Sequence, residues 1–286
     1  MVASSSIVAG DLVTLSPLVR RLTAPNSGVM TGAGTNTYIV GGDALAVIDP
    51  GPDDNEHIAR ILAACGGKDS GRLQWILVTH THRDHSPAAK SLAQLTGAKL
   101  LGNCLQVDDG KQDLSFQPDQ QFSDRQQLIT AEFSLQAILT PGHVDNHVCF
   151  WLPEEQLLFT GDHIMQGSTV VIIPPAGNMK AYLASLEKLL SLPLRFLAPA
   201  HGLLIDQPKQ EIEALITHRK KREAKVVGAL ESLKRAPLSS LTEVVYSDID
   251  PSLYPVAKFS LWAHLLKLEE EGLVLFRDDM WLYLGP

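Results

Sequence analysis

The segment His80–His85 constrains the fold of this chain more than any other, because three imidazoles and one carboxylate lie within six residues. The apolar run Trp75–Val78 comes directly before Thr79 and this segment and is typical of a buried strand. His80 and His82 are two residues apart, so their side chains lie on one face of an extended segment. Imidazole and carboxylate are common ligands of divalent transition metals. The segment therefore predicts ligands for two neighbouring metal ions at a strand end.

Three further residues of metal-ligand type each follow a predicted strand. They are His143 after Phe133–Leu139, Asp162 after Leu157–Phe159, and His201 after Arg195–Leu197. A glycine stands beside each of them and lets the backbone turn sharply. A lone histidine after a strand is usually an ordinary loop residue. Three such positions together with His80–His85 indicate one common site.

The pattern of the chain changes near residue 208. Before it, apolar runs such as Leu45–Ile48, Val148–Leu152 and Val170–Ile173 predict strands, and helical patterns separate them. Sheets with helices on their outer faces are the natural packing for such a pattern. After residue 208 the pattern predicts three helices and a closing pair of strands, which is winged-helix-like. We therefore expect an α/β domain at 1–208 and a small winged-helix domain at 209–286.

Composition narrows the class of protein. With 286 residues, 45% of them hydrophobic and 20% charged, the chain can bury a core and is not disordered. Three cysteines without a CxxC pair favour a reducing, cytoplasmic location. No apolar run approaches the ~18 residues of a membrane span, so no membrane association is expected. The net charge of −8 opposes sequence-independent attraction to a phosphate backbone.

The ordered series HxHxDH, then His, Asp and His, resembles the metallo-β-lactamase superfamily over roughly residues 25–205. The resemblance implies a four-layer αββα sandwich whose metal ligands share one sheet edge. It implies that one metal is held by His80, His82 and His143, the second by Asp84, His85 and His201, and that Asp162 bridges both. It also implies that Asp49 supports these ligands. We further expect His147 to donate a hydrogen bond to a ligand.

These ligands predict hydrolytic chemistry. Two metals ~3.5–4 Å apart share a water and lower its pKa toward ~7, and the resulting hydroxide attacks a carbonyl carbon or a phosphorus atom. We expect Asp84 to orient this nucleophile and Asp162 to hold both metals, so both carboxylates are catalytic candidates. The ligand set itself does not distinguish zinc from iron or manganese. The resemblance implies two zinc ions.

The substrate follows only from resemblance. Gly34–Tyr38 and Ala257–Gly272 resemble a β-lactamase-like endoribonuclease branch with a C-terminal winged helix, which implies phosphodiester cleavage of single-stranded RNA. That branch includes thioesterases that release acyl chains from carrier proteins. A thioesterase or other acyl hydrolase, including a glyoxalase II-like enzyme, therefore stays the alternative. Antibiotic-cleaving members lack an aspartate at the position of Asp162, so β-lactam hydrolysis is not expected.

Two basic features of the C-terminal region bear on nucleic acid. The third predicted helix, Val256–Glu271, carries Lys258 and Lys267 but ends in three glutamates, so we do not expect sequence-specific DNA binding. The run Arg219–Arg222 lies on a predicted long helix beside His218. It either attracts a phosphate chain or forms a solvated helix face, the commoner role of such a run. We expect His57 and His218 to be solvated.

Overall fold

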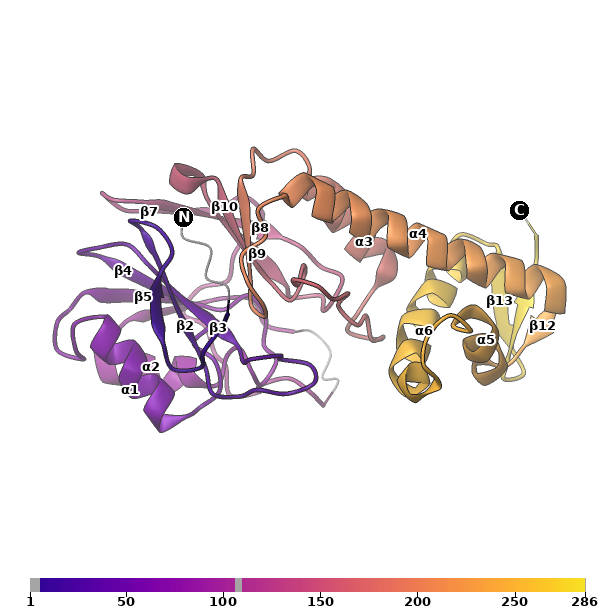
Figure 1. The fold of residues 1–286 in the computed structure, drawn as a ribbon, viewed down its shortest axis with the longest axis horizontal. Coiled ribbons are helices and arrows are strands. Elements are labelled where there is room, and N and C mark those ends of the chain that lie inside the picture. Colours follow the sequence, from indigo (N-terminus) through magenta and orange to yellow (C-terminus); the bar gives the residue numbers. More distant parts are fainter. Residues whose placement is uncertain (1–5, 106–109, 286) are drawn as a thin grey trace. The chain divides into compact units, whose positions relative to one another are not determined.

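The computed structural model describes residues 6–105 and 110–285, which divide into two compact units (Figure 1). The first unit contains the chain up to Thr140, together with Asn146–Ser168 and Pro193–Pro208. The second contains Pro141–Asp145, Thr169–Leu192 and the chain from Lys209 onward. Helix α3, Met179–Leu189, thus groups with the C-terminal region. The division into domains at 1–208 and 209–286 stays a prediction.

A six-stranded sheet forms one half of the first unit. Its strands run in sequence order: β1 Leu12–Thr14, β2 Val19–Thr23, β3 Asn36–Val40, β4 Leu45–Ile48, β5 Leu73–Leu77 and β6 Lys99–Leu101. The first four strands pair antiparallel, whereas β4, β5 and β6 are parallel. The parallel strands are connected through α1, Asn55–Ala64, and α2, Ala88–Thr96, which cover the sheet (Figure 1). The side chain of Asp54 accepts a hydrogen bond from His57 N at the start of α1 and thereby caps the helix.

A five-stranded sheet in the order β11-β10-β9-β8-β7 forms the other half. Its strands are β7 Gln127–Ile129, β8 Ser134–Leu139, β9 Val148–Leu152, β10 Leu157–Gly161 and β11 Phe196–Pro199, with the 3-10 turn η1 Pro153–Glu155 between β9 and β10. Residues of both sheets, among them Tyr38, Phe150 and Phe159, form one buried cluster. This cluster between the sheets confirms the predicted sandwich.

The second unit ends in a winged-helix arrangement (Figure 1). Its elements are α4 Pro208–Leu233, β12 Arg235–Ala236, α5 Leu238–Val245, η2 Pro251–Leu253, α6 Tyr254–Glu270, β13 Val274–Arg277 and β14 Met280–Tyr283. Asp278 and Asp279 both have positive φ, as a two-residue hairpin turn requires. The predicted helices and hairpin are confirmed. The two-residue β12 was missed because it is too short to leave a pattern.

The predicted strand Val170–Ile173 is wrong, since these residues belong to no strand. Their carbonyl groups accept hydrogen bonds from side chains instead of a neighbouring strand: Val170 O from Arg219 and Val171 O from Nδ1 of His143. Periodicity alone cannot separate such an extended segment from a strand. Within the described part of the chain, no helix is long and apolar enough to cross a membrane.

The core between the sheets gives a stability prediction. Phe150 is 0% exposed, and its ring centroid lies 5.3 Å from that of Phe122. Phe150→Ala leaves a cavity there, so we expect it to lower the free energy of unfolding by about 3–5 kcal/mol. Ile129→Ala, at a side chain 70% exposed, should change it by about 0.5 kcal/mol or less. Urea unfolding followed by circular dichroism measures both, and equal losses would contradict the assigned core.

Candidate metal centre

The metal-ligand residues lie where neighbouring strands end. β4 and β5 pair in parallel, so their carboxyl ends lie side by side. Asp49 directly follows β4, and Thr79 comes two residues after β5. The backbone N–H of Thr79 donates to Oδ1 of Asp49 at 2.7 Å, and its hydroxyl donates to Oδ2 at 2.8 Å. These two bonds hold the start of the segment His80–His85 against the end of β4.

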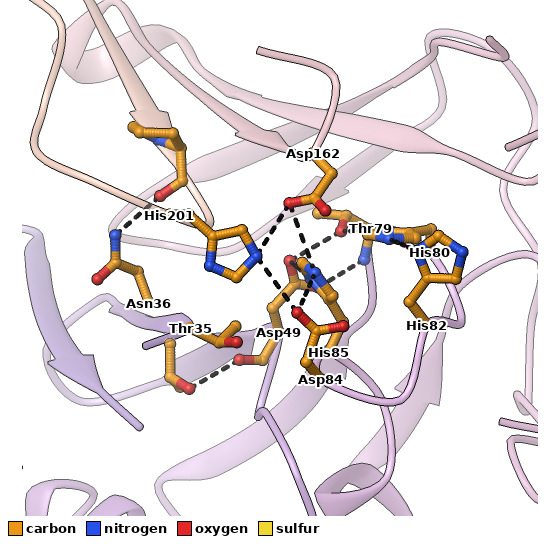
Figure 2. A network of polar contacts seen from close by, with 12 residues as sticks. Thr35, Asn36, Asp49, Thr79, His80, His82, Asp84, His85, Asp162 and His201 are labelled. Atoms are coloured by element: carbon orange, nitrogen blue, oxygen red, sulfur yellow. Dashed lines mark hydrogen bonds and ion pairs between the residues drawn. The ribbon is translucent and has the colours of Figure 1, made fainter. Parts of the chain in front are cut away.

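The carboxylate of Asp49 also fixes which nitrogen of His85 carries the proton. Asp49 is 2% exposed, and its Oδ2 lies 3.0 Å from Nδ1 of His85 (Figure 2). Since a carboxylate only accepts, Nδ1 is the donor and Nε2 keeps its lone pair when the ring is neutral. The Thr79 hydroxyl has already given its one proton to Asp49, so it accepts from Nδ1 of His80 at 3.1 Å. Nε2 of His80 is therefore also a lone-pair donor, the form that binds a metal.

Backbone carbonyls fix two more histidines in the same way. Nδ1 of His201 donates to Gly34 O at 3.2 Å, and Nδ1 of His143 donates to Val171 O at 2.9 Å. Gly34 has φ +135°, and a Cβ there would lie 2.0 Å from Ala24 O, so only glycine fits this loop. Both histidines thus leave Nε2 available as a ligand atom.

Asp84, His85 and His201 form one of two groups of possible metal ligands (Figure 2). Oδ2 of Asp84 lies 3.3 Å from Nε2 of His201 and 3.4 Å from Nε2 of His85. Oδ1 of Asp162 lies 3.3 Å and 3.5 Å from the same two nitrogens. Ligand atoms about 2.0–2.1 Å from a shared tetrahedral centre lie roughly 3.3–3.4 Å apart. The spacing of lone-pair atoms therefore fits a divalent cation among them.

The electrostatics of this group also favour a cation. Burial works to lower the pKa of His85, but the carboxylates of Asp84, Asp162 and Asp49 outweigh it and raise that pKa well above its usual value. Burial likewise opposes the raised pKa of His201 beside Asp162 and Asp84. Burial works to raise the pKa of Asp84, yet the two imidazoles hold it well below its usual range. The carboxylates thus make this a place where positive charge is stabilised, as a proton or as a metal ion.

His80, His82 and Asp162 belong to the second group. One nitrogen of each imidazole and one carboxylate oxygen of Asp162 lie within 4.8 Å of one another. Nε2 of His80 is 2.9 Å from Nδ1 of His82. Asp162 is a member of this group, while its Oδ1 also faces His85 and His201. His143 belongs to the second unit of the structure, and its binding of the same metal as His80 and His82 stays a prediction.

The predictions for the remaining histidines have different outcomes, and His218 is exposed, as predicted. His147 is buried, its Nδ1 lies 2.8 Å from the Thr140 hydroxyl, and its ring centroid lies 5.2 Å from that of His80. Its predicted hydrogen bond to a ligand stays a prediction. The prediction that His57 is solvated is wrong. It is fully buried, because it lies four residues before Ile61 on the inner face of α1.

His57 belongs to the polar network that sequence reasoning missed. Its Nε2 lies 3.0 Å from the hydroxyl of Thr37, which donates to the carbonyl of Asp49 at 2.7 Å. Burial lowers the pKa of His57 to about 4, so the ring is neutral at pH 7. The roles of Thr37 and Thr79 left no signal, because a threonine in a strand is commonplace. The helical position of His57 did carry one, since it shares a face with Ile61.

Comparisons with known proteins agree with this geometry. Residues 30–201 match the model of the metallo-beta-lactamase superfamily, and residues 238–281 match a beta-lactamase associated winged helix domain. The chain belongs to the metallo-beta-lactamase superfamily. It is a hydrolase of that superfamily with a winged-helix domain at its C-terminal end.

Several relatives and solved structures cover most of the chain. A "Beta-lactamase-like protein 2 homolog" of Drosophila melanogaster is 30% identical over 91% of this chain and 93% of its own length. An "Atrochrysone carboxyl ACP thioesterase" of Aspergillus fumigatus is 30% identical over 79% of this chain and 69% of its own length. A beta-lactamase domain protein from Burkholderia ambifaria shares the fold with a TM-score of 0.81 at 17% identity, over 98% of this chain and 96% of that one.

The contacts of Asp49 generate a prediction. Asp49→Asn replaces one acceptor oxygen by an amide donor, so the orientation of His85 and Thr79 is no longer fixed. We expect Zn²⁺ affinity to fall about 10–100-fold. Competition with a chromophoric chelator, started from metal-free protein, measures the affinity. The control is Asp53→Asn at an exposed carboxylate, which should bind as the unmodified chain does. An unchanged affinity in Asp49→Asn would refute the role of Asp49.

Proposed function

We propose that the two ligand groups hold two divalent metal ions, zinc by resemblance, and that the protein hydrolyses phosphodiester bonds of single-stranded RNA. The observation that carries the dinuclear proposal is the position of Asp162, which belongs to one ligand group while its Oδ1 faces the nitrogens of the other. A carboxylate in that position can bind two cations at once. We also propose a cytoplasmic location, as the cysteine pattern of the sequence predicts.

The side chains around the centre have separate tasks. Bound divalent cations lower the pKa of water to about 7 and stabilise negative charge on a substrate oxygen. The buried imidazoles keep their ligand nitrogens aimed at the centre, because each Nδ1 proton is already donated elsewhere. The side chain of Asp84 is 29% exposed, against 12% for Asp162, so its carboxylate is the more accessible of the two to incoming water. Asp84 can accept a hydrogen bond from that water and orient its attack.

RNA is proposed because of the endoribonuclease-branch resemblance noted in the sequence. The Drosophila relative, which matches both regions of this chain, supports the same overall architecture. An acyl thioester is the second candidate, favoured by the relatives named as thioesterases. The net charge of −8 opposes a polyanionic substrate and does not oppose a small acyl one. The arrangement of ligand atoms is compatible with hydroxide attack on a phosphorus atom and on a carbonyl carbon alike.

A direct assay separates the two substrates. Purified, Zn²⁺-loaded protein is incubated with a fluorescently labelled single-stranded RNA and, in parallel, with a series of acyl thioesters. We expect RNA cleavage that a chelator abolishes and that added Zn²⁺ restores, because the cations supply the nucleophile. The metal-free protein is the control. If the protein hydrolyses thioesters and does not cleave RNA above that control, the thioesterase function replaces the RNA-cleaving one.

The bridging role of Asp162 has its own test. Asp162→Ala removes the oxygen that faces both groups, so we expect fewer than two metal ions per chain and a large loss of activity. Inductively coupled plasma mass spectrometry of dialysed protein gives the metal content. The matched control is Asp206→Ala, an exposed carboxylate, which should keep two ions. A variant Asp162→Ala that retained both ions and full activity would refute bridging.

A further inference from the structure

The basic run on α4 is not a uniformly solvated helix face. Arg219 is 3% exposed and Arg222 is 8% exposed, whereas Lys220 and Lys221 between them are exposed. Residues three apart lie on the same side of a helix, so both arginines point inward together. Fully buried arginines are rare unless they are paired. The question for Arg219 and Arg222 is therefore which groups around them pair with their charges.

Both arginines line a cavity of about 270 Å³ that lies wholly within the second unit. One wall is the segment Thr169–Val171, and the others come from α4, from Tyr246 at the end of α5, and from α6, including Ser260. The polar part of its lining consists of the two arginines, His218 and the hydroxyl-bearing residues Thr169, Tyr246 and Ser260, and the rest is aliphatic. None of its lining residues is a predicted metal ligand.

The positive charge around this cavity is not balanced by the protein. Arg222 and Lys225 share one carboxylate, Asp248, each at 2.8 Å. Among the described residues, Arg219 has no carboxylate within ion-pair distance, and its guanidinium donates to Val170 O and lies 5.3 Å from the Tyr182 ring. Two cations therefore share one carboxylate and a third has none, in a chain whose net charge is −8.

One donor of Arg219 also lacks an acceptor. Its Nε is buried and makes no hydrogen bond within the described residues. A buried charge without a counter-ion is strongly unfavourable. Burial lowers the pKa of His218, at the same cavity, and the charges of Arg219 and Arg222 lower it further. An anion inside the cavity would supply both the missing charge and further hydrogen-bond acceptors.

We propose that this cavity binds one phosphate group, either as the free ion or as the end of a phosphate ester. Guanidinium groups form forked hydrogen bonds that match phosphate oxygens, and hydroxyl groups add single donors. A volume of about 270 Å³ is several times the ~30 Å³ share of one water, which leaves room for a phosphate and part of its ester group. This inference is independent of the proposed substrate.

Isothermal titration with inorganic phosphate tests the site, on full-length metal-loaded protein at constant ionic strength. We expect one binding event per chain in addition to any at the metal centre, and we expect Arg219→Gln to weaken it about tenfold or more, because a charged fork is lost. Lys221→Gln removes the same charge from the exposed face of α4 and should leave that event unchanged. Phosphate bound at the metal centre is common to all variants and cancels in the comparison. A folded Arg219→Gln that binds phosphate like the unmodified chain overturns the proposal.

A second variant covers a failure of Arg219→Gln to fold. Ser260→Leu places a larger side chain into the cavity while both arginines remain, so it should also abolish the binding event. Undiminished binding in Ser260→Leu overturns the proposal. Competition by ribose 5-phosphate distinguishes the two forms of the ligand: displacement of phosphate supports an ester, and its failure supports the free ion. If no phosphate binds beyond that at the metal centre, the proposal is overturned for the free ion and for the ester.

Discussion

The carboxylate of Asp49 is the interaction on which the rest of the centre depends. It accepts the backbone N–H and hydroxyl of Thr79 and Nδ1 of His85, so it joins the ends of two parallel strands and sets the tautomer of a ligand. Through Thr79 it also determines the proton position on His80. A buried carboxylate with three donors is satisfied, whereas removal of one partner leaves a costly buried group. The residues predicted to bind metal are therefore already positioned by the protein's own hydrogen bonds.

Sequence analysis recovered what leaves a periodic or local signal. Strand ends followed by ligand residues predicted the edge of the sandwich, and helical spacing predicted α4 and α6. It could not recover the roles of Thr37 and Thr79, because their contacts join segments far apart in the sequence, whereas the burial of His57 was predictable from the helix face that it shares with Ile61. It also could not show that Arg219 and Arg222 point inward, since the alternation of buried and exposed basic residues is only visible once α4 has neighbours. Long-range packing therefore determines the roles of the two threonines and the burial of the two arginines.

The basic run on α4 contains two exposed lysines, Lys220 and Lys221, and two buried arginines, Arg219 and Arg222, whose surroundings differ. Lys220 reaches Glu187 on the protein surface at 3.2 Å, a solvated pair that contributes little to stability. Arg222, two residues later, is buried against the ring of Tyr246 at 4.3 Å and bonds the carbonyl of Val245 at 2.7 Å. The basic run thus has a solvent-exposed face and an inward face, and only on the inward face does positive charge lack enough neighbouring carboxylates.

The segment Thr169–Val171 contacts both this inward face and His143, one of the predicted metal ligands. Successive carbonyls of the segment accept hydrogen bonds from Arg219 and from Nδ1 of His143. Those acceptors are occupied by side chains, which is why an apolar run with strand-like composition forms no strand. Arg219 and His143 thus hold successive residues of one extended segment in place without a partner strand.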